Sequence, residues 1–380
     1  MSRELYVGLM SGTSLDGVDA VLADLAGAKP RLLADAHLPF DAALRRELLA
    51  LNSAGENEIE RAALAGNALA ARFASAVAEV LSGSKTPASE IRAIGCHGQT
   101  VRHRPESGYT TQIGNAALLA ELTGARVVAD FRSRDVAAGG QGAPLAPAFH
   151  AAVFADRAED RAVLNLGGIA NLTSLPRKGD VTGFDSGPGN CLLDLWAMQH
   201  LGSQFDAGGA WAAAGQVIPA LLERMLQEPY LSAPPPKSTG RDLFNEAWLR
   251  RMLKGGEEAR DVQATLLELT ARSVALAASR NCRGARRLIV CGGGAKNDTL
   301  IRRIAEVLSP AAVETSSRHG IDPHLVEAAA FAWLAKQALD GRPGNLRSVT
   351  GARGPRVLGA VYLPSGGALA GRRAGSSSAP

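Results

Sequence analysis

One pattern occurs twice in this chain, once in each half, and it limits the possible folds more than any other feature. In the first half the apolar run Leu5–Met10 stops at the polar turn SGTS, and a second run covers residues 18–25. In the second half Ala162–Leu166 stops at a glycine pair, and Ile169–Leu175 follows it. Short apolar runs joined by a glycine-containing turn are typical of β-hairpins. Each half is therefore predicted to open with a strand–turn–strand unit.

Helical periodicity and further short apolar runs follow both hairpins. Apolar residues recur at helical spacing over residues 41–51, 58–81, 191–201, 262–281, 298–308 and 323–339. More buried strands are predicted at residues 31–37, 91–96, 126–130 and 287–291, and another near Gly183 ends in the loop FDSGPGN. Strands that alternate with helices favour an α/β fold with mixed sheets.

The glycine- and proline-rich stretch GGQGAPLAP, at residues 139–147, is the best candidate for a junction between domains. A chain of 380 residues is long enough for two domains of about 150 residues or more each. We therefore expect an N-terminal lobe over residues 1–145 and a C-terminal lobe over 146–363. The Gly/Ser/Ala-rich segment 364–380 is predicted to be a disordered tail.

Composition excludes several classes of protein. Hydrophobic residues make up 46% and charged residues 21%, as in a globular chain with a large core. The net charge is only +4, aromatic residues make up 4%, and no run of five Lys/Arg occurs, which argues against nucleic-acid binding. No uninterrupted apolar run reaches the ~18 residues of a membrane span, and no signal peptide is apparent, so a cytoplasmic protein is expected. The four scattered cysteines predict buried thiols and no zinc site.

Two familiar phosphate-binding motifs do not fit this sequence. The tripeptide Lys237–Thr239 resembles the end of a P-loop, but three prolines precede it, and proline has no N–H to offer a phosphate. The segment CGGGAKN lacks the glycine spacing of a dinucleotide-binding fingerprint. The small residues of the turn SGTS allow backbone N–H groups to approach phosphate oxygens, and Asp16 could hold Mg²⁺ through water. An ordinary polar turn is the alternative, which the second glycine hairpin makes less favourable.

A second set of glycines follows the predicted strand at residues 287–291. Gly292, Gly293 and Gly294 leave room for a flat adenine ring to lie against the backbone, and a helix follows them. A tight strand–helix turn without a ligand explains the same residues about equally well.

The candidate general base is Asp185, which follows an apolar approach and opens the sequence SGPGN. A carboxylate on a rigid loop beside a cleft is well placed to remove a proton. The alternative is an Asx turn that caps the helix beginning after Asn190.

Polar clusters at the ends of two predicted strands of the first half supply groups for a sugar. Gln99 and Thr100 belong to the cluster HGQT, and Arg132 to the cluster DFR, where it could clamp a carboxylate. Glu327 is a single acid on the apolar side of a predicted helix and is expected to find a partner or a ligand. His97 and His103 are expected to be structural.

Taken together, these segments resemble the anhydro-N-acetylmuramic acid kinase family. The matching segments are GLMSGTSLDGVDA, IGCHGQTVRHRP, QIGN, DFRSRDVAAGGQGAPLAP, LNLGGIANLT, GFDSGPGN, PPPKSTGRDLF, CGGGAKN and EAAAFAWLA, which occur in this order over most of the chain. One departure is Ser186, which stands where the family pattern DTGPGN has threonine.

The resemblance implies the fold of the superfamily of sugar kinases, heat-shock ATPases and actin, with two related α/β lobes and a nucleotide cleft between them. It implies that ATP and water convert 1,6-anhydro-N-acetylmuramic acid, a sugar of cell-wall recycling, into N-acetylmuramic acid 6-phosphate and ADP. Another sugar kinase of the superfamily, or a non-catalytic actin-like ATPase, is the alternative. A homodimer is left open.

The resemblance also implies roles for individual residues. ATP would be carried by Gly12, Thr13, Ser14, Leu15, Asp16, Gly17, Val18 and Asp19. Asp185 would be the catalytic base, and the sugar would contact Gln99, Thr100, Arg132 and Glu327. The residues themselves add the hairpin with Gly167 and Gly168 as a second clasp on the triphosphate, Gly292, Gly293 and Gly294 as the adenine site, and Asp16 as the residue that holds Mg²⁺.

Overall fold

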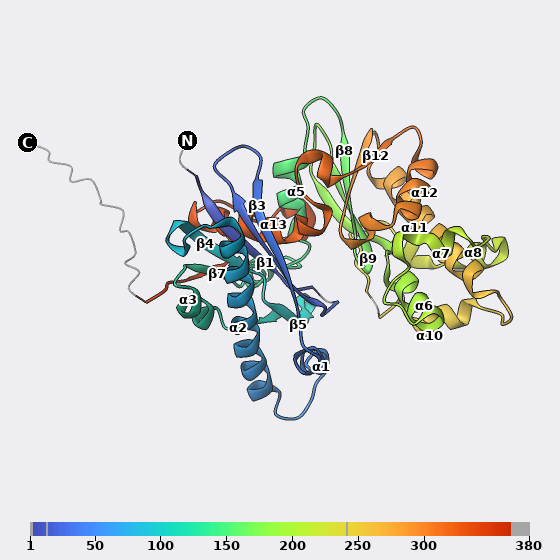
Figure 1. Ribbon diagram of the computed structural model, residues 1–380. Helices are drawn as coiled ribbons and strands as arrows, with labels where there is room; N and C mark the ends of the chain where they lie inside the picture. Colours follow the sequence, from blue (N-terminus) through green and yellow to red (C-terminus); the bar gives the residue numbers. More distant parts are fainter. Residues whose placement is uncertain (1–2, 13, 241, 366–380) are drawn as a thin grey trace, which may run out of the picture.

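The computed structural model describes residues 3–12, 14–240 and 242–365, which form two lobes that each contain one mixed β-sheet (Figure 1). The predicted ATP contact Thr13 and the predicted disordered tail beyond residue 365 lie outside the described residues.

The first sheet has six strands in the order β13-β7-β4-β1-β2-β3. Their bounds are Leu5–Met10 for β1, Gly17–Asp24 for β2, Arg31–Pro39 for β3, Ile91–Cys96 for β4, Val127–Ala129 for β7 and Ala360–Tyr362 for β13. Strand β2 pairs antiparallel with β1 and β3, whereas β4 pairs parallel with β1 and β7.

The second sheet has five strands in the order β10-β9-β8-β11-β12. They are β8 (Arg161–Leu166), β9 (Ile169–Leu175), β10 (Thr182–Pro188), β11 (Arg287–Cys291) and β12 (Ala312–Thr315). Strand β9 pairs antiparallel with β8 and β10, and β11 pairs parallel with β8 and β12. Strand order and directions therefore match β3-β2-β1-β4-β7 of the first sheet, which confirms the predicted α/β fold of two related lobes with mixed sheets.

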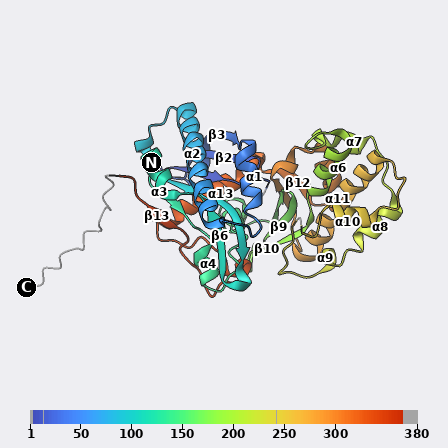
Figure 2. The same ribbon diagram turned by 90° about the horizontal axis from the view of Figure 1, so that it is seen from below.

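Helices cover both sheets. In the first lobe they are α1 (Ala42–Ala50), α2 (Glu58–Ser84), α3 (Ala116–Thr123) and α4 (Ser133–Ala137), and a small hairpin of β5 (Gln99–Arg104) and β6 (Tyr109–Ile113) adjoins them. The second half contributes α5 (Ala146–Phe154), α6 (Cys191–Leu201), α7 (Ala210–Ala213), α8 (Pro219–Leu226), α9 (Pro229–Ser232), α10 (Glu246–Met252), α11 (Ala259–Asn281), α12 (Asp298–Leu308), α13 (Val326–Leu339) and α14 (Arg347–Thr350). Figure 2 shows β9 and β10 on the side of the second lobe that faces the first, with α6 to α11 beyond them.

Helix α2 is long and apolar enough to cross a membrane by length and composition alone. Its buried side chains, among them Leu69, Phe73 and Val77, belong to the core of the first lobe. A core helix meets the same criterion of length and composition.

The chain returns to the first lobe after the second sheet is complete. Helix α13 packs on β1, β4 and β2, and β13 pairs antiparallel with β7 at the edge of the first sheet. In Figure 1 these red elements lie among the blue and teal ones of the first lobe. The predicted C-terminal lobe of residues 146–363 therefore gives its last elements to the first sheet. Helix α13 packs mainly on that sheet, and its other apolar side shares a buried cluster with α5 and with Val163 and Ile289 of the second sheet.

Candidate active site

The side chain of Gln99, the first residue of β5, holds the turn after β1. The side chain of Gln99 is almost completely buried; its Oε1 accepts a hydrogen bond from the Ser11 hydroxyl, and its Nε2 donates to the Gly12 carbonyl at 3.2 Å. Both ends of the amide are therefore used on the turn. Gln99 was predicted to contact the sugar; in the structure its side chain holds the predicted phosphate turn in place.

His97 connects the same turn to Arg132. The guanidinium of Arg132 has only N–H donors, so Nη2, at 2.9 Å, must donate to an unprotonated Nε2 of His97. The proton of His97 then lies on Nδ1, which donates to the Ser11 carbonyl at 3.1 Å. Burial lowers the pKa of His97 to about 3, and the charge of Arg132 acts in the same direction. His97 is therefore neutral, as expected for a structural residue, and its role is to orient Arg132.

Arg132 is held at a second point, where Nη1 donates to the Gly142 carbonyl at 2.9 Å. Burial lowers the pKa of this guanidinium to about 10, while the charges of Glu327 and Asp135 oppose the shift. The side chain stays cationic at neutral pH. A fixed cation of this kind can receive a carboxylate.

Glu327 reaches this region because α13 lies unusually close to the sheet. Gly8 of β1 and Gly95 of β4 are paired neighbours, and a Cβ on either would overlap with the backbone carbonyl of Ala328 or Phe331 in α13. Burial raises the pKa of the Glu327 carboxyl, and the positive charge of Arg132 partly offsets that effect. The two glycines thus let one helix bring an acid close enough to Arg132 for their charges to interact.

The side chains of the predicted ATP segment do not all face the same way. Leu15 and Val18 belong to the hydrophobic core of the first lobe, so only their backbone groups are available to a ligand. Ser14 and Asp16 are exposed, and the Ser14 hydroxyl donates to Asp16 Oδ1 at 2.8 Å. Leu15 adopts φ 55°, a left-handed conformation that is strained for leucine and typical of functional turns.

The predicted ATP glycines divide into two groups according to the space around them. Gly12 has no heavy atom within 3.5 Å of the position of a Cβ, Gly293 has none within 4 Å, and Gly167 has its nearest at 3.5 Å. Packing inside the protein therefore does not require glycine at these three positions, whereas close approach of a ligand would. Gly17, Gly292 and Gly294 instead pack tightly against neighbouring strands, and a Cβ at Gly294 would lie 2.7 Å from Leu166.

The turn between β8 and β9 packs directly on the end of β10. The carbonyl of Gly168 accepts from the backbone N–H of Gly189 and Cys191, each at 3.0 Å, and the carbonyl of Gly167 accepts from Asn190 at 2.9 Å. These bonds fix the second glycine turn relative to the strand that carries Asp185.

Asp185 lies within β10, opposite Asn171 of β9, and a bulge follows it between Asp185 and Gly187. The prediction that it stands in a loop after the strand was wrong, because the ladder with β9 continues to Pro188. Its carboxylate does not cap the following helix, whose N-cap is Asn190. That observation removes the Asx-turn alternative.

The segment after α9 holds the carboxylate of Asp185. Oδ2 accepts from the Ser238 hydroxyl and from the Thr239 backbone N–H, both at 3.0 Å, and neither bond uses Oδ1. Burial raises the pKa of Asp185, while these two bonds and the charge of Lys237 oppose the rise. Because desolvation outweighs these opposing effects, the carboxylate is a stronger base than a free one, and the two hydrogen bonds fix its position.

Lys237 and Tyr230 complete the support for Asp185. The Tyr230 hydroxyl donates to the backbone carbonyl of Asp185 at 3.0 Å, and Lys237 Nζ donates to the Tyr230 carbonyl at 3.0 Å. The ammonium also lies 4.6 Å from the centroid of the Tyr230 ring. The role of the segment PPPKSTGRD could not be assigned from the sequence, because its contact with Asp185 joins residues about fifty positions apart.

Asp185 lies near the junction of the two lobes. A Cβ at Gly183, two residues earlier in β10, would lie 2.9 Å from Pro147 and 3.3 Å from Val349. Alternate residues of a strand face the same side, so the side chain of Asp185 leaves β10 on the face that meets the junction segment.

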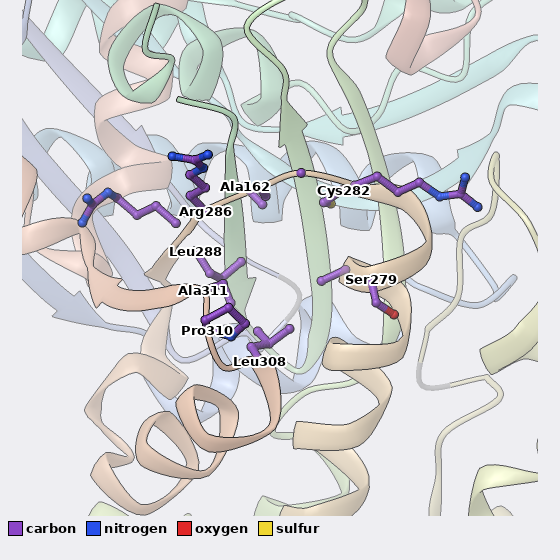
Figure 3. Close-up of a pocket in the computed structure, with 13 residues that line it drawn as sticks. Ala162, Ser279, Cys282, Arg286, Leu288, Leu308, Pro310 and Ala311 are labelled. Atoms are coloured by element: carbon purple, nitrogen blue, oxygen red, sulfur yellow. The ribbon is translucent and has the colours of Figure 1, made fainter. Parts of the chain in front are cut away.

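A cavity of about 410 Å³ lies elsewhere, at the opposite end of the second sheet (Figure 3). It is lined by residues at the start of β8 and β11 and at the end of α11, including Ala162, Leu288 and Cys282. Ligands of α/β sheets bind at the carboxyl ends of the strands, where Gly167 and Gly292 lie, so this cavity is not the candidate active site.

Comparisons with known proteins show the family to which the chain belongs. The family model "Anhydro-N-acetylmuramic acid kinase" matches residues 4–364. A relative of that name from Variovorax paradoxus (strain S110) is 57% identical over 95% of this chain and 100% of its own length. Relatives of the same name from Nitrosospira multiformis and Nitrosomonas europaea are each 53% identical, over 95% and 94% of this chain and 100% and 99% of their own lengths. Identity of this degree over the full length shows that the chain belongs to the anhydro-N-acetylmuramic acid kinase family.

Proposed function

We propose that this protein is an ATP-dependent kinase that opens the anhydro bridge of 1,6-anhydro-N-acetylmuramic acid with water and phosphorylates its 6-oxygen. The products are N-acetylmuramic acid 6-phosphate and ADP, and the reaction serves recycling of the cell wall in the cytoplasm. Membership of the family over residues 4–364 carries this proposal. The position of Asp185 also supports the proposal. Its carboxylate is partly desolvated and lies near the junction of the two lobes.

Asp185 is the proposed general base. Its Oδ1, which neither Ser238 nor Thr239 uses, takes a proton from a water molecule as the water oxygen attacks the anomeric carbon. The bond between the anomeric carbon and the 6-oxygen breaks, and the 6-oxygen attacks the γ-phosphorus in line while ADP leaves. One carboxylate thus couples ring opening to phosphoryl transfer.

Arg132 and Glu327 are the proposed groups for the sugar, together with Thr100 and Gln99. Arg132 would bind the carboxylate of the substrate's lactyl group, because His97 and the Gly142 carbonyl already fix its guanidinium. Glu327 would accept hydrogen bonds from sugar hydroxyl or amide groups. Burial raises the pKa of Glu327, so its carboxylate oxygens are stronger hydrogen-bond acceptors than those of an exposed glutamate.

The open glycines 12, 167 and 293 are the proposed points of closest approach to ATP, with the neighbouring Ser14 and the backbone of Leu15. Asp16 fits Mg²⁺, since it offers an exposed carboxylate beside the turn and magnesium prefers oxygen ligands together with water. Bound Mg²⁺ supplies positive charge for the phosphate oxygens.

An isotope experiment tests the function directly. Purified protein is given ATP, Mg²⁺ and the anhydro sugar in ¹⁸O-labelled water, and the product is analysed by mass spectrometry and NMR. We expect one ¹⁸O on the anomeric carbon and none in the transferred phosphate. Phosphorylation of free N-acetylmuramic acid with no turnover of the anhydro sugar would show an ordinary hydroxyl kinase instead.

A further inference from the structure

Two histidines and one aspartate converge beside the predicted phosphate turn. Asp19 Oδ1 lies 2.7 Å from Nδ1 of His37 and 3.1 Å from Nε2 of His324. All three candidate ligand atoms lie within 4.8 Å of one another. The side chains are partly exposed, at 21% for Asp19, 43% for His37 and 36% for His324, so an ion could enter from solvent.

The backbone brings these residues together from three elements. Asp19 of β2 and His37 of β3 are directly paired in the antiparallel ladder, so their side chains share one face of the sheet. Gly17 lies next to the His37 ring; a Cβ there would lie 2.9 Å from Cε1 of that ring, so glycine leaves the imidazole its place. His324 lies in a short 3₁₀ helix, Pro323–Leu325. The side chain of Asp322 caps this helix by accepting a hydrogen bond from the backbone N–H of His324.

The donor set identifies the kind of ion. Two imidazole nitrogens and one carboxylate oxygen suit zinc and similar divalent transition metals, whereas Mg²⁺ prefers oxygen ligands. Tetrahedral zinc with bonds of about 2.0–2.1 Å separates its ligand atoms by about 3.3–3.4 Å. The observed distances of 2.7 and 3.1 Å from Asp19 Oδ1 need only a small opening, and the two imidazole nitrogens lie within 4.8 Å of each other, so small side-chain movements bring the three atoms to this geometry.

We propose that Asp19, His37 and His324 form a binding site for a divalent transition metal of the zinc type. The ion replaces the two hydrogen bonds that now join the imidazoles to Asp19, and water completes its coordination. Asp16 and Glu327 add negative charge nearby, and Lys296 adds positive charge.

The site would link two parts of the molecule. Asp19 and His37 belong to the first sheet, whereas the carbonyl of Pro323, next to His324, accepts from the N–H of Gly292 at 2.8 Å. A bound ion would therefore tie the first hairpin to the segment that contacts Gly292, just after β11.

The test is a zinc titration of the full chain without nucleotide or sugar, so that its outcome does not depend on the proposed reaction. Zn²⁺ is titrated against a chromophoric chelator, and Co²⁺ is then bound and its visible spectrum recorded. We expect one Zn²⁺ per wild-type chain and Co²⁺ bands of four- or five-coordinate geometry. The four cysteines are buried in the native protein and should not compete.

Variants decide whether these residues are the ligands. We expect His37→Gln and His324→Gln each to weaken zinc binding by at least about tenfold, since even indirect support of a metal ligand is worth that much. His200→Gln is the matched control, because this exposed histidine lies in the second lobe, where its ring packs at a tilt against Trp196. Thermal melting confirms that each variant is folded. Absence of zinc binding in the wild type, or equal affinity in wild type and His37→Gln, would overturn the proposal.

Discussion

The two lobes share one arrangement of five strands, but different groups hold the glycine turn in each: side chains in the first lobe and backbone hydrogen bonds in the second. In the first lobe the side chains of Gln99 and His97 form hydrogen bonds to the backbone of the turn. The space around a Cβ at Gly12 is free of other protein atoms within 3.5 Å. In the second lobe the carbonyls of Gly167 and Gly168 are already bonded to the chain after β10. The reactive group there, Asp185, is held by a separate segment.

The repeated topology therefore gives each lobe a turn at the equivalent end of its sheet. The side chains around each turn decide which chemical groups it presents. The first lobe offers a turn held by side chains and fixed charged groups such as Arg132. The second offers a turn held by backbone hydrogen bonds and the partly buried acid Asp185.

The largest effect is expected at Asp185. Asp185→Asn keeps the shape of the side chain but removes the base, so turnover should fall at least ~100-fold while ATP binding is retained. Steady-state kinetics and equilibrium nucleotide binding measure the two quantities. Asp180→Asn, an exposed carboxylate just before β10, is the control and should retain full turnover. Near-normal turnover of Asp185→Asn would show that Asp185 of the second lobe is not the general base.

The next effect is expected at the fixed cation of the first lobe. Arg132→Gln removes a charged hydrogen-bond donor, so kcat/KM for the sugar should fall about 10- to 100-fold, with little change in KM for ATP. Arg134→Gln changes an exposed arginine of α4 and serves as the control. If KM for ATP rose as much as KM for the sugar, Arg132 would serve the nucleotide instead.

A pair of glycine substitutions compares the open and the packed turn residues. Gly12→Ala has room for its methyl group, so KM for ATP should rise by about tenfold without a change in Tm. Gly294→Ala places a Cβ 2.7 Å from Leu166 and should lower stability by about 1–3 kcal/mol. Thermal melting and ATP kinetics of both variants are compared. A lower Tm for Gly12→Ala would show that packing, and not a ligand, requires that glycine.

The smallest effect is expected at the support of Asp185. The Ser238 hydroxyl stabilises the ionised carboxylate and so lowers the pKa of Asp185; Ser238→Ala should raise that pKa. Because the base must be ionised, turnover falls as pH drops through this pKa, and the acid limb of the kcat profile should move to higher pH. Ser232→Ala, an exposed serine bonded to the Pro229 carbonyl, is the control. An unmoved acid limb would argue that Ser238 does not set the basicity of Asp185.

Local patterns in the sequence were sufficient for many elements. The predicted strands 91–96, 169–175 and 287–291 and the helices 191–201 and 298–308 have the same bounds as β4, β9, β11, α6 and α12. Each is defined by apolar spacing and by glycine or polar residues at its ends. The helices between residues 207 and 252 and the hairpin β5–β6 were not predicted, because their apolar periodicity is short or interrupted.

What the sequence determined by itself is the repeated hairpin, the alternation of strands and helices, and the candidate residues that stand at strand ends. Tertiary structure alone decided that β13 returns to the first sheet, that Ser238 and Thr239 hold Asp185, and that Asp19 meets His37 and His324. It also decided which glycines are open and which are packed. The physical reason is that periodicity and turn chemistry act between near neighbours, whereas these contacts join residues far apart in the chain and exist only once the lobes have packed.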